Sequence, residues 1–323
     1  MAAPGSCTLT VTVDDTTDPQ DDAANGYTVT VINKVPTTAI DGPTTSPEGT
    51  GFKLFGNPKD VFADTLSYEW TVTKDTGDGP AVFKTGTFKN IWFLPDDGCA
   101  TCVYEATYTV TDDDGASTTE VWAVDVTNVN PDAQMLDEFG STLPPVYDGG
   151  KEGDTVSLQA VFTDAGAADT HTITWEAKLL GEVIDTGVGP TFDFVAPDDG
   201  AYFVVLTVTD DDGGTDTPPS PLITVTNAAA KITNLVTDPT PSAGKPVALN
   251  VFFTDPGIGD EHTVTVDWGD GSPVDTAADV TSPAALSHTF AAGAYRAKIC
   301  VADDDGAKKC KKIWYNAGAA PVS

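Results

Sequence analysis

Apolar and polar residues alternate along most of this chain with a period of two. The runs 155–162 and 247–253 carry an apolar residue at every second position. In the first run the alternation places Val156, Leu158 and Phe162 on one face. A period of two predicts β-strands with one buried face, and helix-forming runs are nearly absent. The sequence therefore predicts an all-β protein.

Aspartate clusters mark a long internal repeat. Each cluster ends a strand-like run and precedes a glycine, and the clusters start at Asp112, Asp210 and Asp303, which are 98 and 93 residues apart. This spacing is the length of one small β-sandwich, and roughly seven short strands per repeat predict tandem immunoglobulin-like β-sandwiches. The predicted division is a partial module at 1–32, three modules at 33–127, 128–227 and 228–316, and a tail at 317–323.

The third copy carries the motifs of a known family. It reads Val-Asp-Trp-Gly-Asp-Gly-Ser at 266–272, Ser-His-Thr-Phe at 287–290 and Gly-Ala-Tyr at 293–295. These runs resemble the PKD-type (polycystic-kidney-disease-type) domain, whose signature is an aromatic-Gly-Asp-Gly-Ser turn, a His-Thr-aromatic strand and a Gly-x-Tyr strand start. The chain is thus expected to contain PKD-type immunoglobulin-like β-sandwiches.

The other two copies depart from this pattern. The second keeps Asp-Thr-His-Thr-x-Thr-Trp at 169–175 but reads Glu-Ala-Lys in place of the Gly-Asp-Gly turn, and the first keeps Trp70 and a displaced Gly-Asp-Gly at 77–79. The resemblance covers residues 33–316. It implies extracellular modules used as spacers, in adhesion, in surface layers or appended to secreted hydrolases, and it does not imply catalysis.

The charge of the chain is strongly acidic. Its 323 residues include 49 Asp and Glu against 16 Lys and Arg, for a net charge of −33. Such a surface repels nucleic acid and anionic membranes and attracts divalent cations. No stretch approaches the ~20 apolar residues of a membrane span, so we expect no membrane insertion and no nucleic-acid partner. Acid spread over every face would instead indicate adaptation to high salt, but its concentration at equivalent turns favours cation binding.

Calcium is the expected ligand of these turns. A hard cation takes 6–8 oxygens at about 2.3–2.6 Å. Each sandwich would bring such oxygens to one end: a Glu-Gly step at the entry of a module, an aspartate hairpin of the same or the neighbouring module, and asparagines from the linkers. Asp-Gly is good turn chemistry without any ion, but three consecutive aspartates repel one another unless a counter-ion is present. The third copy has Ala243 in place of the glutamate, so its site is expected to be weaker.

The predicted Ca²⁺ ligands follow from aligning the copies. In the second copy they are Glu152, Asp164, Asp169, Asp210 and Asp212. The others are Glu48, Asp64, Asp112, Asp114, Asn128, Asn130, Asp255, Asp260, Asp303 and Asp305.

The cysteines favour an oxidising compartment, outside the cell or at its surface. Cys300 and Cys310 flank the third aspartate turn and would lie opposite each other in a hairpin, which predicts a disulfide. Cys99 and Cys102 lie in a β-turn with no helix N-terminus to activate a thiol and no second ligand pair for zinc, so a local bridge is favoured. Cys7 is left over, either free or intermolecular.

Residues 1–32 resemble the last two strands of a module whose first strands are missing. An isolated hairpin is marginal in water and leaves both edges unpaired. We expect it to join either an upstream half-module or, by strand addition, a neighbouring copy of the chain. Head-to-tail addition of this kind would give a homopolymer.

Catalysis is not expected from this sequence. His171 and His262 occupy the same repeat position, and His288 lies in the His-Thr-aromatic strand, so the module explains all three. The alternating pattern does not place Trp92, Trp122 and Trp314 in a core. These side chains would either pack at strand edges or form a surface that binds glycans or protein.

The predicted function is that of an extracellular structural protein. It would be a calcium-stiffened rod of β-sandwich modules acting in filament, surface-layer or adhesive assembly. The alternative is a non-catalytic spacer or carbohydrate-binding arm of a larger secreted hydrolase.

Overall fold

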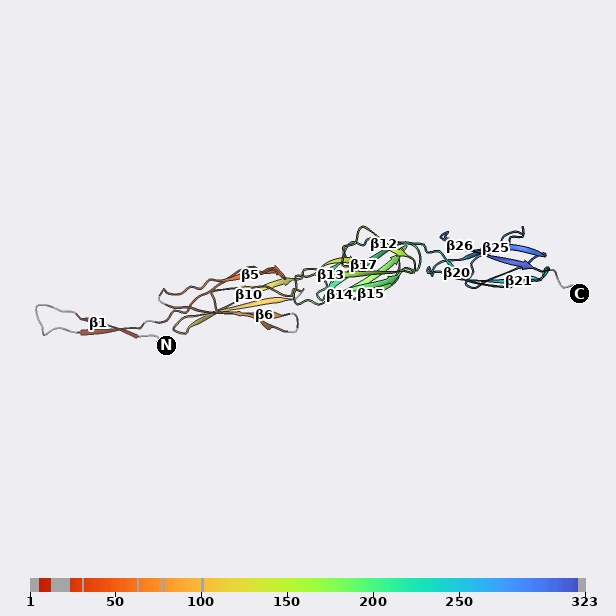
Figure 1. Cartoon of the computed structure of the whole chain (residues 1–323). Coiled ribbons are helices and arrows are strands. Elements are labelled where there is room, and N and C mark those ends of the chain that lie inside the picture. Colours follow the sequence, from red (N-terminus) through yellow and green to blue (C-terminus); the bar gives the residue numbers. More distant parts are fainter. Residues whose placement is uncertain are drawn as a thin grey trace, which may run out of the picture. The chain divides into compact units, whose positions relative to one another are not determined.

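Every regular element that the structure describes is a β-strand (Figure 1). The computed structural model describes residues 6–12, 24–30 and 32–318 except 63, 76, 78, 100 and 101. This result confirms the predicted all-β class. No helix long and apolar enough to cross a bilayer occurs among those residues.

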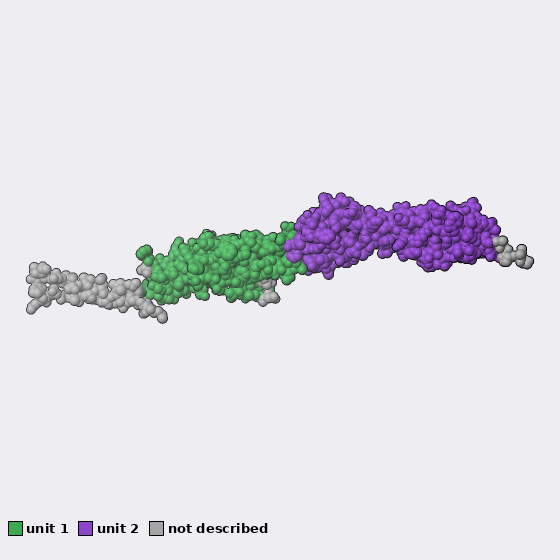
Figure 2. Space-filling view, viewed as in Figure 1, with its two compact units in different colours: residues 1–132, 163–171, 209–215 green, residues 133–162, 172–208, 216–323 purple. Residues whose placement is uncertain are grey.

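The chain divides into two compact units (Figure 2). Unit 1 contains residues 1–132 together with 163–171 and 209–215. Unit 2 contains residues 133–162, 172–208 and 216–323. Two loops of the second predicted module therefore belong to the same unit as the first module.

The N-terminal segment contains the predicted pair of strands. β1 (Ser6–Thr12) and β2 (Ala24–Thr30) pair antiparallel, with Ser6 opposite Thr30 and Thr12 opposite Ala24. The side chains of this pair, Cys7 included, lie outside the described residues.

The first module is built from two sheets. One has the strand order β4-β10-β9-β6-β7 and the other β3-β5-β8. Long β9 pairs with both β6 and β10, so it forms the middle of the larger sheet. The strands are β3 (Ile40–Asp41), β4 (Thr45–Pro47), β5 (Phe52–Gly56), β6 (Ser67–Asp75), β7 (Ala81–Gly86), β8 (Asn90–Phe93), β9 (Val103–Thr111) and β10 (Ser117–Thr127).

The second module repeats this plan. Its sheets have the orders β12-β19-β17-β14-β15 and β11-β13-β16, and the short β18 pairs with β17. The strands are β11 (Asp132–Asp137), β12 (Val146–Lys151), β13 (Thr155–Thr163), β14 (His171–Leu179), β15 (Glu182–Val188), β16 (Thr191–Val195), β17 (Gly200–Asp210), β18 (Thr215–Asp216) and β19 (Leu222–Thr226).

The third module has the sheets β23-β22-β25-β26 and β20-β21-β24. β25 and β26 form a long hairpin that turns at the third aspartate cluster. The strands are β20 (Lys231–Thr237), β21 (Pro246–Thr254), β22 (Thr263–Asp267), β23 (Asp275–Ala277), β24 (Ala284–Thr289), β25 (Gly293–Ala302) and β26 (Lys308–Ala317).

Each sandwich encloses its own core around one tryptophan. Trp70, Trp175 and Trp268 are fully buried, and the alternation of the strands supplies the aliphatic and aromatic residues around them. Each indole N–H finds a local acceptor, which is the carbonyl of Phe88, the carbonyl of Gly189 or the carboxylate of Asp275. A buried indole N–H needs such a partner. The structure therefore confirms tandem immunoglobulin-like β-sandwiches as the fold.

Among the described residues, Cys99 is bonded to Cys102 and Cys300 to Cys310, as predicted. Cys300 pairs directly with Cys310 across the β25–β26 hairpin. In the first two modules threonine hydroxyls occupy the equivalent cross-strand position, with oxygens 3.0 Å apart at Thr109–Thr119 and 3.3 Å apart at Thr207–Thr217. The third module thus replaces a polar cross-strand pair by a covalent one.

Candidate metal centre

The three aspartates of each hairpin turn differ in their hydrogen-bond partners. The first one folds the turn itself, because its Oδ1 accepts the amide N–H four residues later. These bonds are 2.8 Å at Asp112, 2.7 Å at Asp210 and 2.6 Å at Asp303. A glycine with φ between 90° and 96° completes each turn, a conformation that favours glycine.

The second aspartate fixes the start of another loop. The carboxylates of Asp113, Asp211 and Asp304 accept the backbone N–H of Thr65, Thr170 and Glu261, respectively, at 3.1, 2.8 and 2.9 Å. Turn and loop chemistry therefore accounts for two of the three acids. The third aspartate of each turn is Asp114, Asp212 or Asp305, and its carboxylate makes no equivalent hydrogen bond to a backbone N–H of the described residues.

The Glu-Gly steps bury two glutamates almost completely. Glu48 and Glu152 are each 1% exposed. Glu48 accepts the N–H of Gly98 and of Val129, both at 2.6 Å, and Glu152 accepts the N–H of Ala228 at 2.6 Å. Val129 and Ala228 lie in the linkers that follow the first and second modules. Each glutamate therefore holds its linker through a backbone hydrogen bond.

These glutamates lie among aspartates of the following copy of the repeat. We call the group in unit 1 cluster 1 and the group in unit 2 cluster 2. Cluster 1 consists of Glu48, Asp97, Asp164, Asp169, Asp210 and Asp212. Cluster 2 consists of Glu152, Asp198, Asp199, Asp255, Asp260, Asp303 and Asp305.

Backbone contacts fix the loops that carry the aspartates. The N–H of Ala168 donates to the carbonyl of Asp96 at 2.9 Å, and at the equivalent position the N–H of Gly259 donates to the carbonyl of Pro197 at 3.1 Å. Each bond precedes a central aspartate, Asp169 or Asp260, by one residue. The equivalent hydrogen bonds show that the two clusters are built on the same plan.

Subsets of each cluster have the spacing of a cation site. Oxygens from Glu48, Asp97 and Asp169 lie within 4.8 Å of one another. In cluster 2, oxygens from Glu152, Asp198, Asp199 and Asp305 lie within the same distance. Ligands on opposite sides of a Ca²⁺ ion are about 4.6–5.2 Å apart, so these carboxylates fit around one ion.

The acids of cluster 1 shift one another's protonation. Burial, and after it the charges of Glu48, Asp164 and Asp97, raises the pKa of Asp169 to about 7. Burial and the nearby charges of Asp97 and Asp211 raise the pKa of Asp212 to about 6.

Cluster 2 shows the same pattern. Burial, followed by the charges of Glu152, Asp255 and Asp198, raises the pKa of Asp260 to about 7. Burial also raises the pKa of Glu152, against its hydrogen bond from Ala228. Like charges held together in a buried site disfavour ionisation unless a cation compensates them.

Several buried oxygens of these clusters accept no hydrogen bond from the described residues. Both carboxylate oxygens of Asp169 and both of Asp260 are of this kind, as are one oxygen each of Glu152 and Asp303. The side-chain oxygen of Asn128 is also without a donor, although its Nδ2 donates to Asp210 at 2.9 Å. Buried polar atoms in proteins are almost always satisfied, so oxygens in this state fit a bound cation.

A related half-cluster occurs in the first module. Asp60, Asp64 and Asp112 have oxygens within 4.8 Å of one another, and Asn33 donates to Asp112 at 2.8 Å as Asn128 does to Asp210. Burial, with the charge of Asp60 next, raises the pKa of Asp64. Asp114 lies close enough to add to this shift. Asp60, Asp64 and Asp112 of the first module correspond to Asp164, Asp169 and Asp210 of the second module, which lie in cluster 1.

The structure specifies which of the expected ligands lie together. Glu152 does not lie with Asp164, Asp169, Asp210 and Asp212. It lies in cluster 2 with Asp198 and Asp199 of its own copy and with Asp255, Asp260 and Asp305 of the next copy. The predicted Asp164, Asp169, Asp210 and Asp212 lie in cluster 1 with Glu48, and the predicted Asn128 lies beside them. The predicted Asn130 donates to the carbonyl of Thr215 at 3.2 Å.

Sequence reasoning missed Asp60, Asp97, Asp198 and Asp199. The sequence signal for Asp97, Asp198 and Asp199 is a Pro-Asp-Asp-Gly run. It occurs at 95–98, before β9, and at 197–200, where β17 begins. The third copy reads Phe-Ala-Ala-Gly at 290–293 instead.

The corresponding end of the third module has no acid at these positions. Gly244 donates to the carbonyl of Phe290 as Gly49 does to Pro95, which places Ala243 in the position of Glu48. Ala292 then stands in the position of Asp97. The described part of the third module thus keeps the backbone of this end and lacks its carboxylates.

The histidines are held by structural contacts. His171 and His262 contact Asp164 and Asp255 at 2.7 and 2.9 Å. His288 contacts Asp270 at 2.7 Å and stacks on Trp268 with ring centroids 4.7 Å apart. Although burial acts in the opposite direction, hydrogen bonds from Ser272 and His288 lower the pKa of Asp270 to about 2.

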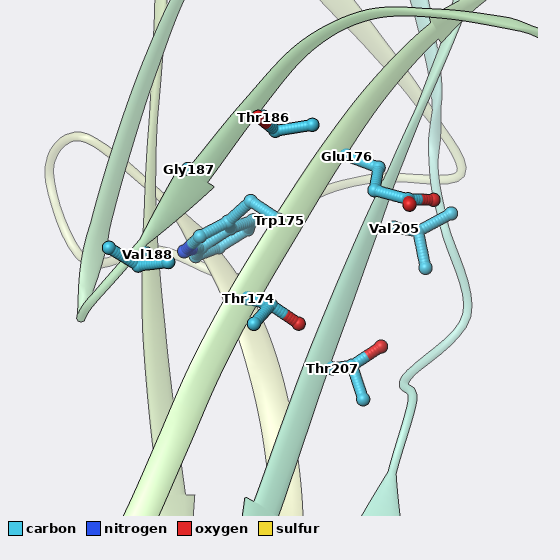
Figure 3. A pocket seen from close by; sticks show the side chains of 8 residues that line it. All are labelled: Thr174, Trp175, Glu176, Thr186, Gly187, Val188, Val205 and Thr207. Atoms are coloured by element: carbon cyan, nitrogen blue, oxygen red, sulfur yellow. The ribbon is translucent and has the colours of Figure 1, made fainter.

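Surface grooves occur on the sheets away from the clusters. The one in Figure 3 has a volume of about 550 Å³ and is bordered mainly by threonine and valine side chains. Its tryptophan, Trp175, is buried and donates to Gly189, so it offers no exposed ring. A groove of about 600 Å³ in the first module does include an exposed ring, because Trp92 is 52% exposed.

Comparison with known proteins assigns the third module to a family. Residues 227–316 match the family model of the PKD domain, which confirms the resemblance found in the sequence motifs. None of the curated proteins matches the chain. PKD and related immunoglobulin-like modules are of the extracellular type and are generally non-catalytic.

Solved structures with tandem modules are similar at low identity. Fibronectin(III)-like modules of CbhA from Clostridium thermocellum are 18% identical, with a TM-score of 0.26, over 59% of this chain and 94% of that one. The FN1–FN3 domains of chicken CNTN1 are 11% identical, with a TM-score of 0.25, over 86% and 100%. Immunoglobulin domains 1–5 of Sidekick-1 are 13% identical, with a TM-score of 0.37, over 99% and 68%.

Proposed function

We propose that the chain is an extracellular structural protein whose linkers are stiffened by calcium, and that it acts in filament, surface-layer or adhesive assembly. The observation that carries this proposal is the pair of equivalent clusters, each with a nearly fully buried glutamate and central carboxylate oxygens that accept no hydrogen bond. Each cluster combines a glutamate of one copy with aspartates of the next. A cation bound there would hold the linker between the two copies.

Calcium fits these clusters better than other common metals. Their donors are carboxylate and amide oxygens, which hard cations prefer. The disulfides agree with an extracellular setting, where calcium sites of modules bind at about 10⁻⁴–10⁻³ M. The clusters would therefore be filled at extracellular calcium and empty under chelation.

The test of this proposal is calcium binding by the purified chain at neutral pH. Isothermal titration should show saturable binding, and the melting temperature should rise in calcium relative to chelator because binding to the folded state alone stabilises it. Absence of saturable binding together with unchanged melting would remove calcium from the account.

Self-association through the N-terminal hairpin is part of the proposal. β1 and β2 pair with each other, and a two-stranded hairpin is marginal alone. Deletion of residues 1–32 should abolish polymers that the intact chain forms in electron micrographs. Assembly of the deletion variant into the same polymers would contradict this role.

A carbohydrate-binding or spacer role within a secreted hydrolase is the second candidate. Its support is the groove beside Trp92, where Phe88 is 79% exposed and Lys84 lies 5.3 Å from the indole ring. Aromatic faces with polar neighbours are suited to sugars. Retardation of the chain in gels that contain polysaccharide, lost on Trp92→Ala, would support this role.

A further inference from the structure

The acids of each cluster form two sets, and in cluster 1 the two sets share one aspartate. In cluster 1 the first set is Glu48, Asp97 and Asp169, and the second is Asp164, Asp169 and Asp210; within each set the oxygens lie within 4.8 Å of one another. Asp169 is common to both. We name the first set of each cluster the clamp pocket and the second the loop pocket.

Cluster 2 has two corresponding sets. Its clamp pocket contains Glu152, Asp198, Asp199 and Asp305. Asp260 and Asp255 belong to its loop pocket with His262, and Asp303 occupies the position of Asp210. Asp260 is the counterpart of Asp169, because equivalent backbone hydrogen bonds fix the residue before each of them, Gly259 and Ala168. This equivalence assigns Asp260 to the position between the two pockets.

Each pocket of cluster 2 contains its own buried oxygen without a donor. Glu152 is 1% exposed and Asp303 is 7% exposed, and each has one carboxylate oxygen that accepts no hydrogen bond from the described residues. Asp260 has two such oxygens. Oxygens without a donor therefore occur in both pockets of cluster 2, and an ion in each pocket would satisfy them.

From this we propose that each cluster binds two calcium ions, one in the clamp pocket and one in the loop pocket, bridged by Asp169 in cluster 1 and by Asp260 in cluster 2. The inference rests on the proposed function, because it specifies how the same clusters bind calcium. It assigns the two oxygens of the central aspartate to different ions.

Charge supports two ions over one. Cluster 2 contains seven carboxyl groups. The basic side chain that contacts them among the described residues is that of His262, 2.9 Å from Asp255. One Ca²⁺ would leave a large negative excess in a partly buried site, and two would leave a much smaller one. Uncompensated buried charge is strongly unfavourable.

A lysine contacts cluster 1. Lys74 contacts Asp97 at 2.7 Å and Asp96 at 2.9 Å, so a lysine already compensates one acid of its clamp pocket. No lysine or arginine ion pair involves the described acids of cluster 2. The clamp ion of cluster 1 is therefore expected to bind more weakly than that of cluster 2.

Glycines adjoin the bridging aspartates. A Cβ on Gly257 would lie 2.6 Å from Oδ1 of Asp260, and a Cβ on Gly166 would meet the carboxylate of Asp169. Neither glycine has a positive φ. Any larger residue would displace the bridging carboxylate, so the loops leave space for it at both positions.

Calcium stoichiometry of the full chain tests the proposal. Equilibrium dialysis against ⁴⁵Ca²⁺, with Asp193→Asn as a matched control for the loss of an exposed acid, should give at least four ions per chain, and the same number for the wild type and the control. Glu152→Gln and Asp303→Asn should each lose one ion, and Asp260→Asn should lose two. Asparagine at 303 keeps an oxygen to accept the N–H of Ala307, which preserves the turn.

The outcomes separate this inference from the proposed function. Two ions in the wild type, with each of the three cluster 2 variants losing the same single ion, would overturn the bridged pair and leave calcium binding in place. Binding of no ions would overturn both. Circular dichroism of each variant would identify a folding defect, and Gly257→Ala, which keeps every charge, should lose the same two ions as Asp260→Asn.

Discussion

Replacing Glu152 by glutamine should change stability in opposite directions with and without calcium. The side chain is 1% exposed, and its Oε1 accepts the N–H of Ala228 at 2.6 Å. A glutamine carbonyl would keep this bond and place an amide NH₂ near Asp198, Asp199 and Asp305. Without calcium the variant removes repulsion, and with calcium it removes a ligand.

The expected size follows from the spacing of the cluster. Two unit charges 4.8 Å apart repel by about 3.5 kcal/mol at an effective dielectric constant of ~20. Asp305 is exposed, so solvent screens part of this repulsion. We therefore expect glutamine to stabilise the calcium-free protein by about 1–2 kcal/mol.

The calcium increment should shrink in the variant. At about 10 mM Ca²⁺, a site with a Kd of about 10⁻⁴–10⁻³ M stabilises the fold by about 1.4–2.7 kcal/mol. Loss of that site should lower the calcium-induced rise in melting temperature by several degrees, since about 1 kcal/mol corresponds to ~4–8 °C for a domain of this size. Calorimetry in chelator and in calcium measures both effects.

Asp193→Asn is the matched control, because Asp193 is exposed on β16 and pairs with Ser157 away from the cluster. It should change neither value. The reasoning would be refuted if Glu152→Gln lowered the melting temperature in chelator and left the calcium increment at its wild-type size.

Further predictions concern pH and covalent structure. In chelator, the melting temperature should fall as pH rises from about 4 to about 7. The reason is that Asp169 and Asp260, whose pKa values are raised to about 7, bind more protons in the folded state than in the unfolded state. A melting temperature that stays constant or rises over this pH range would contradict the raised pKa values. Calcium should remove this slope. Replacing Cys300 and Cys310 by serine should lower the free energy of unfolding by about 3 kcal/mol, because the constraint on the unfolded chain is lost. Threonine at both positions should restore part of this stability, since the first two modules have a threonine pair there. Unfolding in denaturant measures both effects. His288→Ala should raise the pKa of Asp270 above about 2 and destabilise the third module, which an NMR titration and a melting curve would detect.

Much of the fold follows from the pattern of the sequence. Alternation identified the strands around Val156 and Leu158, and the 98- and 93-residue repeat identified the modules. Both features work because one buried face and one buried tryptophan recur in each sandwich.

The site was less predictable because it joins residues from different copies. Alignment finds Glu48 and Asp169 as members of a repeat, but it does not show that a glutamate contacts the loops of the next copy. Asp97 and Asp198 were missed for a related reason. They follow strands of the smaller sheets, and their short Asp-Asp runs are typical of ordinary turns.

Hydrogen exchange at the linker amides tests the central claim most directly. The N–H groups of Val129 and Ala228 donate to Glu48 and Glu152, and the N–H of Gly244 lies at the end that has Ala243 in place of a glutamate. If calcium binds the clusters, exchange at Val129 and Ala228 should be markedly slower in calcium than in chelator, with Gly244 unchanged. Equal exchange at Val129 and Ala228 in the two conditions would contradict a calcium-stiffened linker.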